Sequence, residues 1–282
     1  MVSLKELRKS AAMRLASAQN DSPLADIDCV LMHLGFTKTD LILGDKTIDA
    51  NQENAFWKAV KRLESGKPIQ HITGSCEFMS LEFEVNSSTL IPRSDTEVLV
   101  EAVLDICKSK QNPKIFEVGS GSGCIAVSLA YYNTSATVVS ADISAKALAV
   151  AGRNAKAHKV SDRVIFIRHN IFDGFPKLEE QPDIIVSNPP YIPKDDINRL
   201  DKKVREFEPL SALDGGEDGL DFYRFITENV CLKPNGYLAF EVGINQANDV
   251  KELMSRRFTD IKIIPDLAGI DRVVIGTFSD VK

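Results

Sequence analysis

Residues 116–130, FEVGSGSGCIAVSLA, place three glycines between a short β-rich run and an apolar run typical of a helix. Gly119, Gly121 and Gly123 let the turn adopt positive φ and let a ligand approach the backbone, while the amino end of the next helix offers donors. The stretch is shorter than the dinucleotide fingerprint GxGxxG and lacks the lysine and hydroxyl residue of a P-loop. It predicts a strand–turn–helix unit with a ligand site, without saying which ligand.

Strand and helix patterns alternate on both sides of this stretch. The β-rich runs are KIFEV, ATVVSAD, RVIFI, DIIVS and GYLAFEVG, and helical segments such as SAKALAVAGRNAKAH separate them. This alternation predicts an α/β fold, a doubly wound, Rossmann-like parallel sheet with helices on both faces. The last two runs, DIKIIPD and RVVIGTF, are joined by LAGID, which is too short for a crossover helix, so the last strand should be antiparallel.

The region before this fold has different patterns. Residues 1–70 carry apolar residues at helical spacing, such as Leu4, Leu7, Ala11 and Leu15, and predict a small helical domain. Residues 71–93 alternate apolar and polar side chains in EFMSLEFEV and predict a β-hairpin linker. We therefore expect three parts: a helical domain over 1–70, a linker over 71–93 and a catalytic domain over 94–282.

Composition limits the partners and the compartment. The 282 residues carry a net charge of −6, which lacks the cationic footprint of a protein that depends on phosphate contacts. No apolar stretch approaches the roughly 18 residues of a membrane span, and the amphipathic start lacks a signal-peptide pattern. Five cysteines lie far apart without metal-ligand spacing, so we expect no metal and interpret them as small buried hydrophobes. A cytoplasmic protein is predicted.

An acidic residue ends the second strand pattern. Asp142 follows the glycine stretch by roughly 20 residues, the position from which a carboxylate accepts hydrogen bonds from ribose hydroxyls. The position suits any nucleoside cofactor, NAD included, and Asp142 would alternatively cap the helix that begins SAKAL. After the third strand, Asn170 is suited to reading an adenine amino group with Ile171 or Phe172 against the ring, although a surface loop explains these residues equally well.

The fourth strand ends in the segment SNPPY, which predicts a rigid polar turn at the ligand-binding edge. Pro189 and Pro190 fix φ and remove two donors. A planar amine or amide nitrogen can then donate to the side-chain oxygen of Asn188 and the carbonyl of Pro189, with Tyr191 packed on its plane. Such positioning suits methyl transfer to nitrogen, because a sulfonium donor needs no catalytic triad or metal.

Together, the glycine stretch, Asp142 and NPPY resemble the class I, S-adenosylmethionine-dependent methyltransferases. More closely, the chain resembles the release factor glutamine methyltransferases of the HemK/PrmC family. The shared stretches run in order from residue 66 to residue 274: GKPIQHITGSCEFMSLEFEVNSSTLIPRSDTE, FEVGSGSG, SNPPYIP, FEPLSALDGGEDGLDFYR, LKPNGYLAFEVG and DLAGIDRVV.

The resemblance implies methylation of the glutamine amide nitrogen in the Gly-Gly-Gln motif of peptide chain release factors. It implies that S-adenosylmethionine is the cofactor, held by Gly119, Ser120, Gly121, Ser122, Gly123, Asp142, Asn170, Ile171 and Asn188. It also implies that the glutamine is held by Asn188, Pro189, Pro190, Tyr191, Arg93 and Thr96, with Asn188, Pro189 and Tyr191 as the catalytic group. The helical domain would recognise the release factor, and we expect a monomer.

Two other functions fit parts of the pattern. An adenine-amino DNA or RNA methyltransferase would grip a planar nitrogen in the same way, but it must flip a base and hold nucleic acid in a basic cleft. The acidic composition and the linker stretch disfavour it. A non-catalytic protein that keeps the methyltransferase fold for binding is disfavoured because both the glycine stretch and NPPY are intact.

Overall fold

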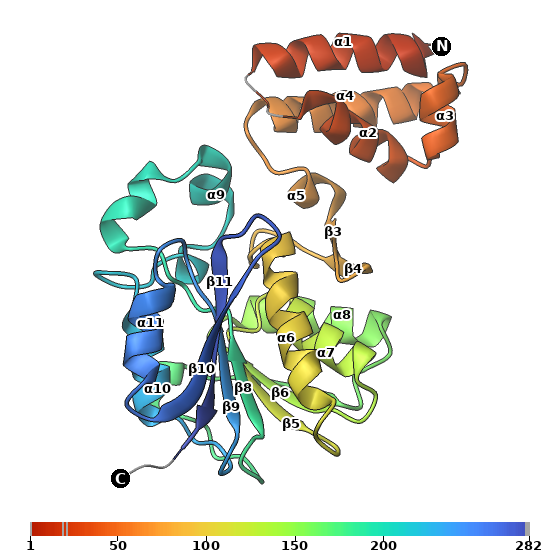
Figure 1. Ribbon diagram of the computed structural model, residues 1–282. Coiled ribbons are helices and arrows are strands. Elements are labelled where there is room, and N and C mark those ends of the chain that lie inside the picture. The colour runs from red at the N-terminus through yellow and green to blue at the C-terminus, as the bar shows by residue number, and fades with distance from the viewer. Residues whose placement is uncertain (1, 19, 21, 280–282) are drawn as a thin grey trace. The chain divides into compact units, whose positions relative to one another are not determined.

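A computed structural model of the chain describes residues 2–18, 20 and 22–279. Its internal contacts divide the chain into two compact units. One comprises Met1–Ser75 with Asp201–Phe207, and the other comprises Cys76–Leu200 with Glu208–Lys282 (Figure 1).

The first unit is helical, as the apolar spacing predicts. Its elements are α1 (Leu4–Ser17), α2 (Pro23–His33), α3 (Lys38–Leu43), α4 (Ala50–Glu64), α5 (Gln70–Thr73), α9 (Lys202–Phe207) and the short antiparallel pair β1 (Val2–Ser3) and β2 (Thr47–Ile48). Capping boxes at Ser3, Thr37 and Asp49 start α1, α3 and α4. The apolar positions that share a face of α1, α2 and α4 are buried in one core: Leu4, Leu7, Ala11, Leu15, Ile27, Val30, Leu31, Phe56, Val60 and Leu63.

The second unit is built on a seven-stranded sheet. Its strands are β5 (Lys114–Val118), β6 (Thr137–Asp142), β7 (Val164–Arg168), β8 (Ile184–Ser187), β9 (Tyr237–Glu241), β10 (Phe258–Pro265) and β11 (Asp271–Phe278). The order across the sheet is β10-β11-β9-β8-β5-β6-β7. Strands β5 to β9 pair in parallel, whereas β11 is antiparallel to both β9 and β10, which confirms the predicted antiparallel last strand. The strand order reverses at β5, and ligands bind at such a switch point.

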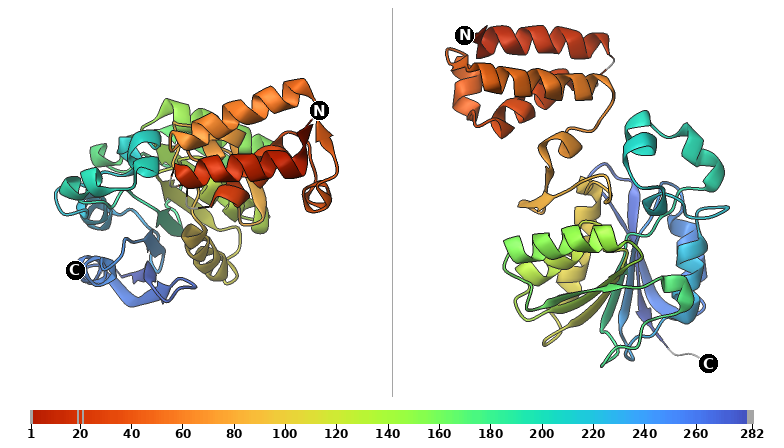
Figure 2. Two further views of the ribbon diagram at one scale, coloured as in Figure 1. Left: turned by 90° about the horizontal axis from the view of Figure 1, so that it is seen from above. Right: turned by 180° about the vertical axis from the view of Figure 1, so that it is seen from behind.

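Helices cover both faces of this sheet (Figures 1 and 2). On one face lie α6 (Glu97–Cys107), α7 (Cys124–Tyr132) and α8 (Ala145–Ala157); on the other lie α10 (Asp221–Asn229) and α11 (Ala247–Met254). Four short 3-10 helices lie in the connections: η1 (Ser94–Thr96), η2 (Ile171–Asp173), η3 (Lys194–Arg199) and η4 (Leu210–Ala212). The two apolar cores on either side of the sheet confirm the doubly wound α/β class.

The predicted hairpin lies before this sheet, formed by β3 (Ser75–Phe78) and β4 (Leu81–Glu84). Its alternating apolar side chains pack into the core beneath α6 and α7, and Phe78 and Phe83 meet edge to face. A two-stranded hairpin is marginal alone, so this burial is what stabilises it.

Two other expectations concern the whole chain. Cys107 is buried, but Cys29, Cys76 and Cys124 are half-buried and Cys231 is exposed. The interpretation of all five cysteines as buried is therefore wrong, because only Cys107 of α6 is fully enclosed in an apolar core. Within the described ranges, no helix combines the length and apolar character needed to cross a membrane.

Candidate active site

Four adjacent parallel strands end together at one edge of the sheet. The paired register of β6, β5, β8 and β9 runs up to Ala141, Val118, Ser187 and Phe240. The residues at the next position on these strands are therefore neighbours across the edge: Asp142, Gly119, Asn188 and Glu241. Residues far apart in the sequence thus meet at the switch point.

An open cleft of about 1140 Å³, a volume that includes solvent at its mouth, lies over this edge. Its walls belong entirely to the second unit. Most of the predicted site residues line it: Arg93, Thr96, Gly119, Ser120, Gly121, Ser122, Asp142, Asn170, Ile171, Asn188, Pro189 and Pro190. Gly123 and Tyr191 do not; Gly123 lies against Ala151 of α8 instead.

Asp142 is held by the backbone on both sides of its carboxylate. The Gly121 N–H donates to Oδ2 at 2.9 Å and the Ser144 N–H donates to Oδ1 at 2.8 Å. Burial raises the pKa of Asp142, and the backbone donors at Ser144 and Gly121 oppose the rise. The cap on α8 comes from Ser144, whose hydroxyl accepts from Ala147, so Asp142 binds the start of this segment without being its N-cap.

Beyond Asp142, the cleft is bounded by an aromatic cluster. Phe172 is 42% exposed. The centroid of its ring lies 4.7 Å from the ring centroid of Phe222 and 5.2 Å from that of Phe225. Asn170 caps η2, with its side-chain oxygen accepting from the Phe172 N–H at 3.2 Å. This bond holds Asn170 in the wall of the cleft, and the buried Ile171 next to it also lines the cleft.

Asn188 lies at the end of the cleft opposite Asn170, and a hydrogen bond to a neighbouring side chain fixes its side-chain amide. Its Nδ2 donates to Oγ1 of the buried Thr96 at 3.2 Å. Because this bond uses Nδ2, the side-chain oxygen of Asn188 remains available to a ligand in the cleft. Pro189 and Pro190 continue the wall in the turn that follows.

Tyr191 belongs to the support of this turn. Burial raises the pKa of Tyr191 to about 12, and its carbonyl accepts from Nε2 of Gln246 at 2.9 Å. The backbone of Gly215 passes so close that a Cβ there would lie 2.7 Å from Cα of Tyr191 and 2.8 Å from the carbonyl oxygen of Pro190. At Gly219, where φ is +80°, a Cβ would clash with the Tyr191 carbonyl. The stretch GGEDG is therefore the backing of the NPPY turn.

Arg93 lines the cleft but is not free there. Its Nη2 donates to both carboxylate oxygens of Glu208, at 2.7 and 2.8 Å. Glu208 is buried; burial raises its pKa and the Arg93 charge opposes the rise. The pair joins the start of the fold to the segment around Pro209, which also lines the cleft.

Sequence reasoning missed two buried carboxyl groups near the edge, Glu117 and Glu241. Burial raises the pKa of Glu117 to about 8 and that of Glu241 to about 7. Glu117 accepts from the hydroxyl of Ser140, which is also 2.6 Å from the hydroxyl of Ser120 in the glycine loop. The available signal was an acidic residue inside or at the end of an otherwise apolar strand, as in KIFEV and YLAFE.

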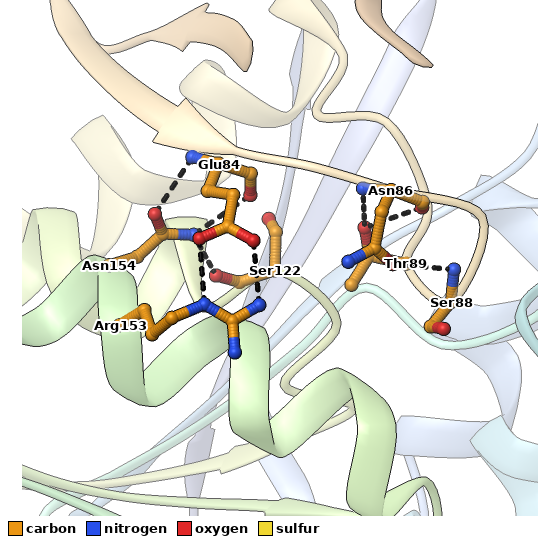
Figure 3. A network of polar contacts seen from close by, with 7 residues as sticks. All are labelled: Glu84, Asn86, Ser88, Thr89, Ser122, Arg153 and Asn154. Carbon is orange, nitrogen blue, oxygen red and sulfur yellow. Dashed lines mark hydrogen bonds and ion pairs between the residues drawn. The ribbon is translucent and has the colours of Figure 1, made fainter. Parts of the chain in front are cut away.

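A polar network ties the hairpin to the glycine loop (Figure 3). The buried Asn154 of α8 accepts from the Glu84 N–H at 2.8 Å and donates to the carbonyls of Glu84 and Ser122 at 3.0 and 2.8 Å. Beside it, Arg153 forms a two-pronged ion pair with Glu84 in which both side chains are well exposed.

Replacing Asn154 by alanine is expected to lower the free energy of unfolding by about 2–3 kcal/mol, because buried backbone groups of Glu84 and Ser122 lose their partner. Urea denaturation measures this. Arg153→Ala is the matched control on the same helix, and it should cost less than about 1 kcal/mol because its ion pair is exposed. Equal costs for the two variants would contradict the role given to Asn154.

Comparison with known proteins finds family matches in both parts of the chain. Residues 93–203 match the family described as Methyltransferase small domain, and residues 6–74 match the PrmC N-terminal domain. A solved methyltransferase structure from Pyrococcus furiosus covers 81% of this chain and 98% of its own, with a TM-score of 0.51 and 17% identity. At that identity it shows the fold alone.

Curated relatives show the family. The release factor glutamine methyltransferase of Geobacter sulfurreducens is 43% identical over 86% of this chain and 85% of its own. The protein of the same name from Moorella thermoacetica is 38% identical over 98% of both chains. The chain therefore belongs to the release factor glutamine methyltransferase family.

Proposed function

We propose that this protein transfers a methyl group from S-adenosylmethionine to the side-chain amide nitrogen of the glutamine in the Gly-Gly-Gln motif of peptide chain release factors. One observation carries the proposal: a single cleft joins a half suited to a nucleoside with a half suited to a planar amide. Family membership supports the same reaction.

The first half fits the nucleoside of the cofactor. Each oxygen of Asp142 accepts one backbone hydrogen bond and keeps a lone pair for a ribose hydroxyl. Apart from the two chain neighbours, none of the described residues has an atom within 4 Å of the place a Cβ would take at Gly121, so the loop leaves room for a ligand against its backbone. Ile171 and Phe172 offer apolar surface for the adenine ring, beside Asn170. When bound, the cofactor supplies an electrophilic methyl carbon on a good leaving group.

The second half holds the acceptor. The amide oxygen of Asn188 and the carbonyl of Pro189 can each accept one hydrogen of a glutamine side-chain amide, which fixes the plane of its nitrogen. The lone pair of an amide nitrogen is delocalised, so these acceptors act by orientation and by stabilising the positive charge that develops on nitrogen. Tyr191 supports the turn from within the fold, and Arg93 and Thr96 complete the wall.

Each of the three parts of the chain is assigned one role in this reaction. We assign recognition of the release factor to residues 1–70, linkage to residues 71–93 and catalysis to residues 94–282. The net charge of −6 supports an enzyme that needs no nucleic acid. We further propose that it acts as a monomer in the cytoplasm.

A labelling experiment tests the proposed function. The protein is incubated with methyl-labelled S-adenosylmethionine and a release factor that carries either Gly-Gly-Gln or Gly-Gly-Ala. Only the Gly-Gly-Gln factor should be labelled, and tandem mass spectrometry should place the methyl group on that glutamine. Equal labelling of the two factors would show that the glutamine is not the acceptor.

A further inference from the structure

Glu241 is a buried acid beside the acceptor half of the cleft, and the reaction described above does not use it. It ends β9 and is 2% exposed. Its Oε2 has no hydrogen-bond partner among the residues that the structure describes. Unpaired buried carboxyl oxygens are rare because they cost folding free energy, so this one calls for a functional reason.

The carboxyl group of Glu241 lies behind the amide that faces the cleft. Asn188 Nδ2 donates to the Thr96 hydroxyl at 3.2 Å. The Thr96 and Asn188 side chains lie close enough to the Glu241 carboxyl group to lower its pKa as hydrogen-bond donors. A hydroxyl that accepts from an amide keeps its own proton to donate. An ionised Glu241 accepts that proton, so the chain of bonds then runs in one direction, from Asn188 through Thr96 to Glu241.

We propose that Glu241 is a positioning residue for Asn188, and that its ionised form holds the Asn188 amide with Nδ2 toward Thr96 and Oδ1 toward the methyl acceptor. The proposal rests on the proposed function for the identity of the acceptor. The hydrogen-bond direction itself depends only on residues of this chain.

Protonation of Glu241 removes this constraint. A carboxylic acid donates its proton to the Thr96 hydroxyl or to the Asn188 oxygen, which permits the Asn188 amide to turn over. Nδ2 then faces the cleft, and a donor cannot accept a hydrogen from the glutamine amide. Methyl transfer should therefore require the ionised form of Glu241.

Several charged or titratable groups face Glu241 from other elements. Burial raises the pKa of Glu241 to about 7; Arg272 of β11 opposes the rise and Asp95 of η1 adds to it. The remaining neighbours have pKa values raised by burial, to about 12 for Tyr191 and Cys124 and well above 10 for Tyr223. These three groups stay protonated at neutral pH, so Glu241 is the group among them that changes charge near pH 7.

The pH dependence of kcat tests the proposal. With saturating S-adenosylmethionine and release factor, kcat of the wild type should rise through a midpoint near the Glu241 pKa of about 7 and then level off. In Glu241→Gln, kcat should no longer depend on pH and should lie about tenfold below the plateau of the wild type, because the neutral glutamine side chain fixes Asn188 less firmly. A structural role alone would lower kcat by one factor at every pH, so an unchanged profile shape in Glu241→Gln would overturn the proposal.

Two further variants sharpen the test. Thr96→Val removes the middle hydroxyl at nearly constant shape, so the Glu241→Gln/Thr96→Val double variant should be little slower than Thr96→Val alone. Asp95→Asn is the matched control: losing this neighbouring charge should shift the midpoint to lower pH and keep the sigmoidal shape. Additive losses in the double variant, or a midpoint that moves upward in Asp95→Asn, would contradict the proposal.

A measurement without any acceptor separates this inference from the proposed function. The side-chain amide resonances of Asn188, assigned by their absence in Asn188→Ala, are followed by NMR over the same pH range. They should titrate near the Glu241 pKa of about 7 in the wild type and stay constant in Glu241→Gln. Titrating resonances in a protein that methylates no glutamine would refute the proposed function alone, whereas resonances that do not titrate would refute the role of Glu241.

Discussion

Asn188→Ala is expected to lower kcat by about 10²- to 10³-fold, because the acceptor nitrogen loses the group that orients it and stabilises its developing charge. The Asn188 side chain is held by Thr96 at the acceptor end of the cleft, whereas the nucleoside end is built from Asp142 and the glycine loop. The affinity for S-adenosylmethionine should therefore stay within about threefold of the wild type, a difference of roughly 0.6 kcal/mol.

Single-turnover transfer of a labelled methyl group at saturating cofactor measures the rate, and calorimetry measures cofactor affinity. Asn170→Ala is the control at the other end of the cleft, and it should weaken cofactor binding more than it slows transfer at saturation. The role given to Asn188 would be wrong if Asn188→Ala kept a rate within about threefold of the wild type, since that corresponds to only about 0.6 kcal/mol.

Asp142→Ala is expected to raise the dissociation constant for S-adenosylmethionine by about 100-fold, which is roughly 2.7 kcal/mol. The larger contribution is the hydrogen bonding of the ribose to a charged acceptor, which in total is worth about 1.5–3 kcal/mol. The substitution also removes the acceptor of the Gly121 and Ser144 N–H groups, which anchors the loop. At saturating cofactor, kcat should change much less, because Asn188 and Pro189 remain in place.

Asp142→Asn separates these two contributions. It keeps one oxygen as an acceptor but turns the other into a donor, which cannot accept from the Gly121 or Ser144 N–H group. Its dissociation constant should fall between those of the wild type and Asp142→Ala. Affinities in Asp142→Ala that match the wild type would show that the carboxylate does not bind the cofactor.

The fold was predictable because its signals are local. Glycines after KIFEV, strand and helix patterns in turn, and a short connection before RVVIGTF each report on neighbouring residues. The resulting strand order and the antiparallel β11 follow from general rules of chain connection. Asp142 and Asn188, at the ends of β6 and β8, were also predictable from local sequence, because each directly follows an apolar run.

The features of the site that could not be predicted from the sequence depend on contacts between segments far apart in the chain. Glu241 ends an apolar strand as Asp142 does, but Thr96 and Asn188, the side chains that lower its pKa, come from two other parts of the chain. The pairing of Arg93 with Glu208 likewise joins separate segments. Tyr191 was assigned to the acceptor surface from its place in NPPY, yet its partly buried side chain packs against the apolar core that contains Tyr223 and Phe240.

The close approach of Gly215 and Gly219 to the NPPY turn has a consequence for redesign. Side chains at those two positions would collide with the backbone of Pro190 and Tyr191, so the turn keeps its shape only over a bare backbone. An engineer who wishes to transplant a different methyl-acceptor turn must therefore exchange residues 188–191 and 215–219 together, as one cassette. If residues 188–191 alone were exchanged, the new turn would have to pack against residues 215–219, whose backbone fits the original turn.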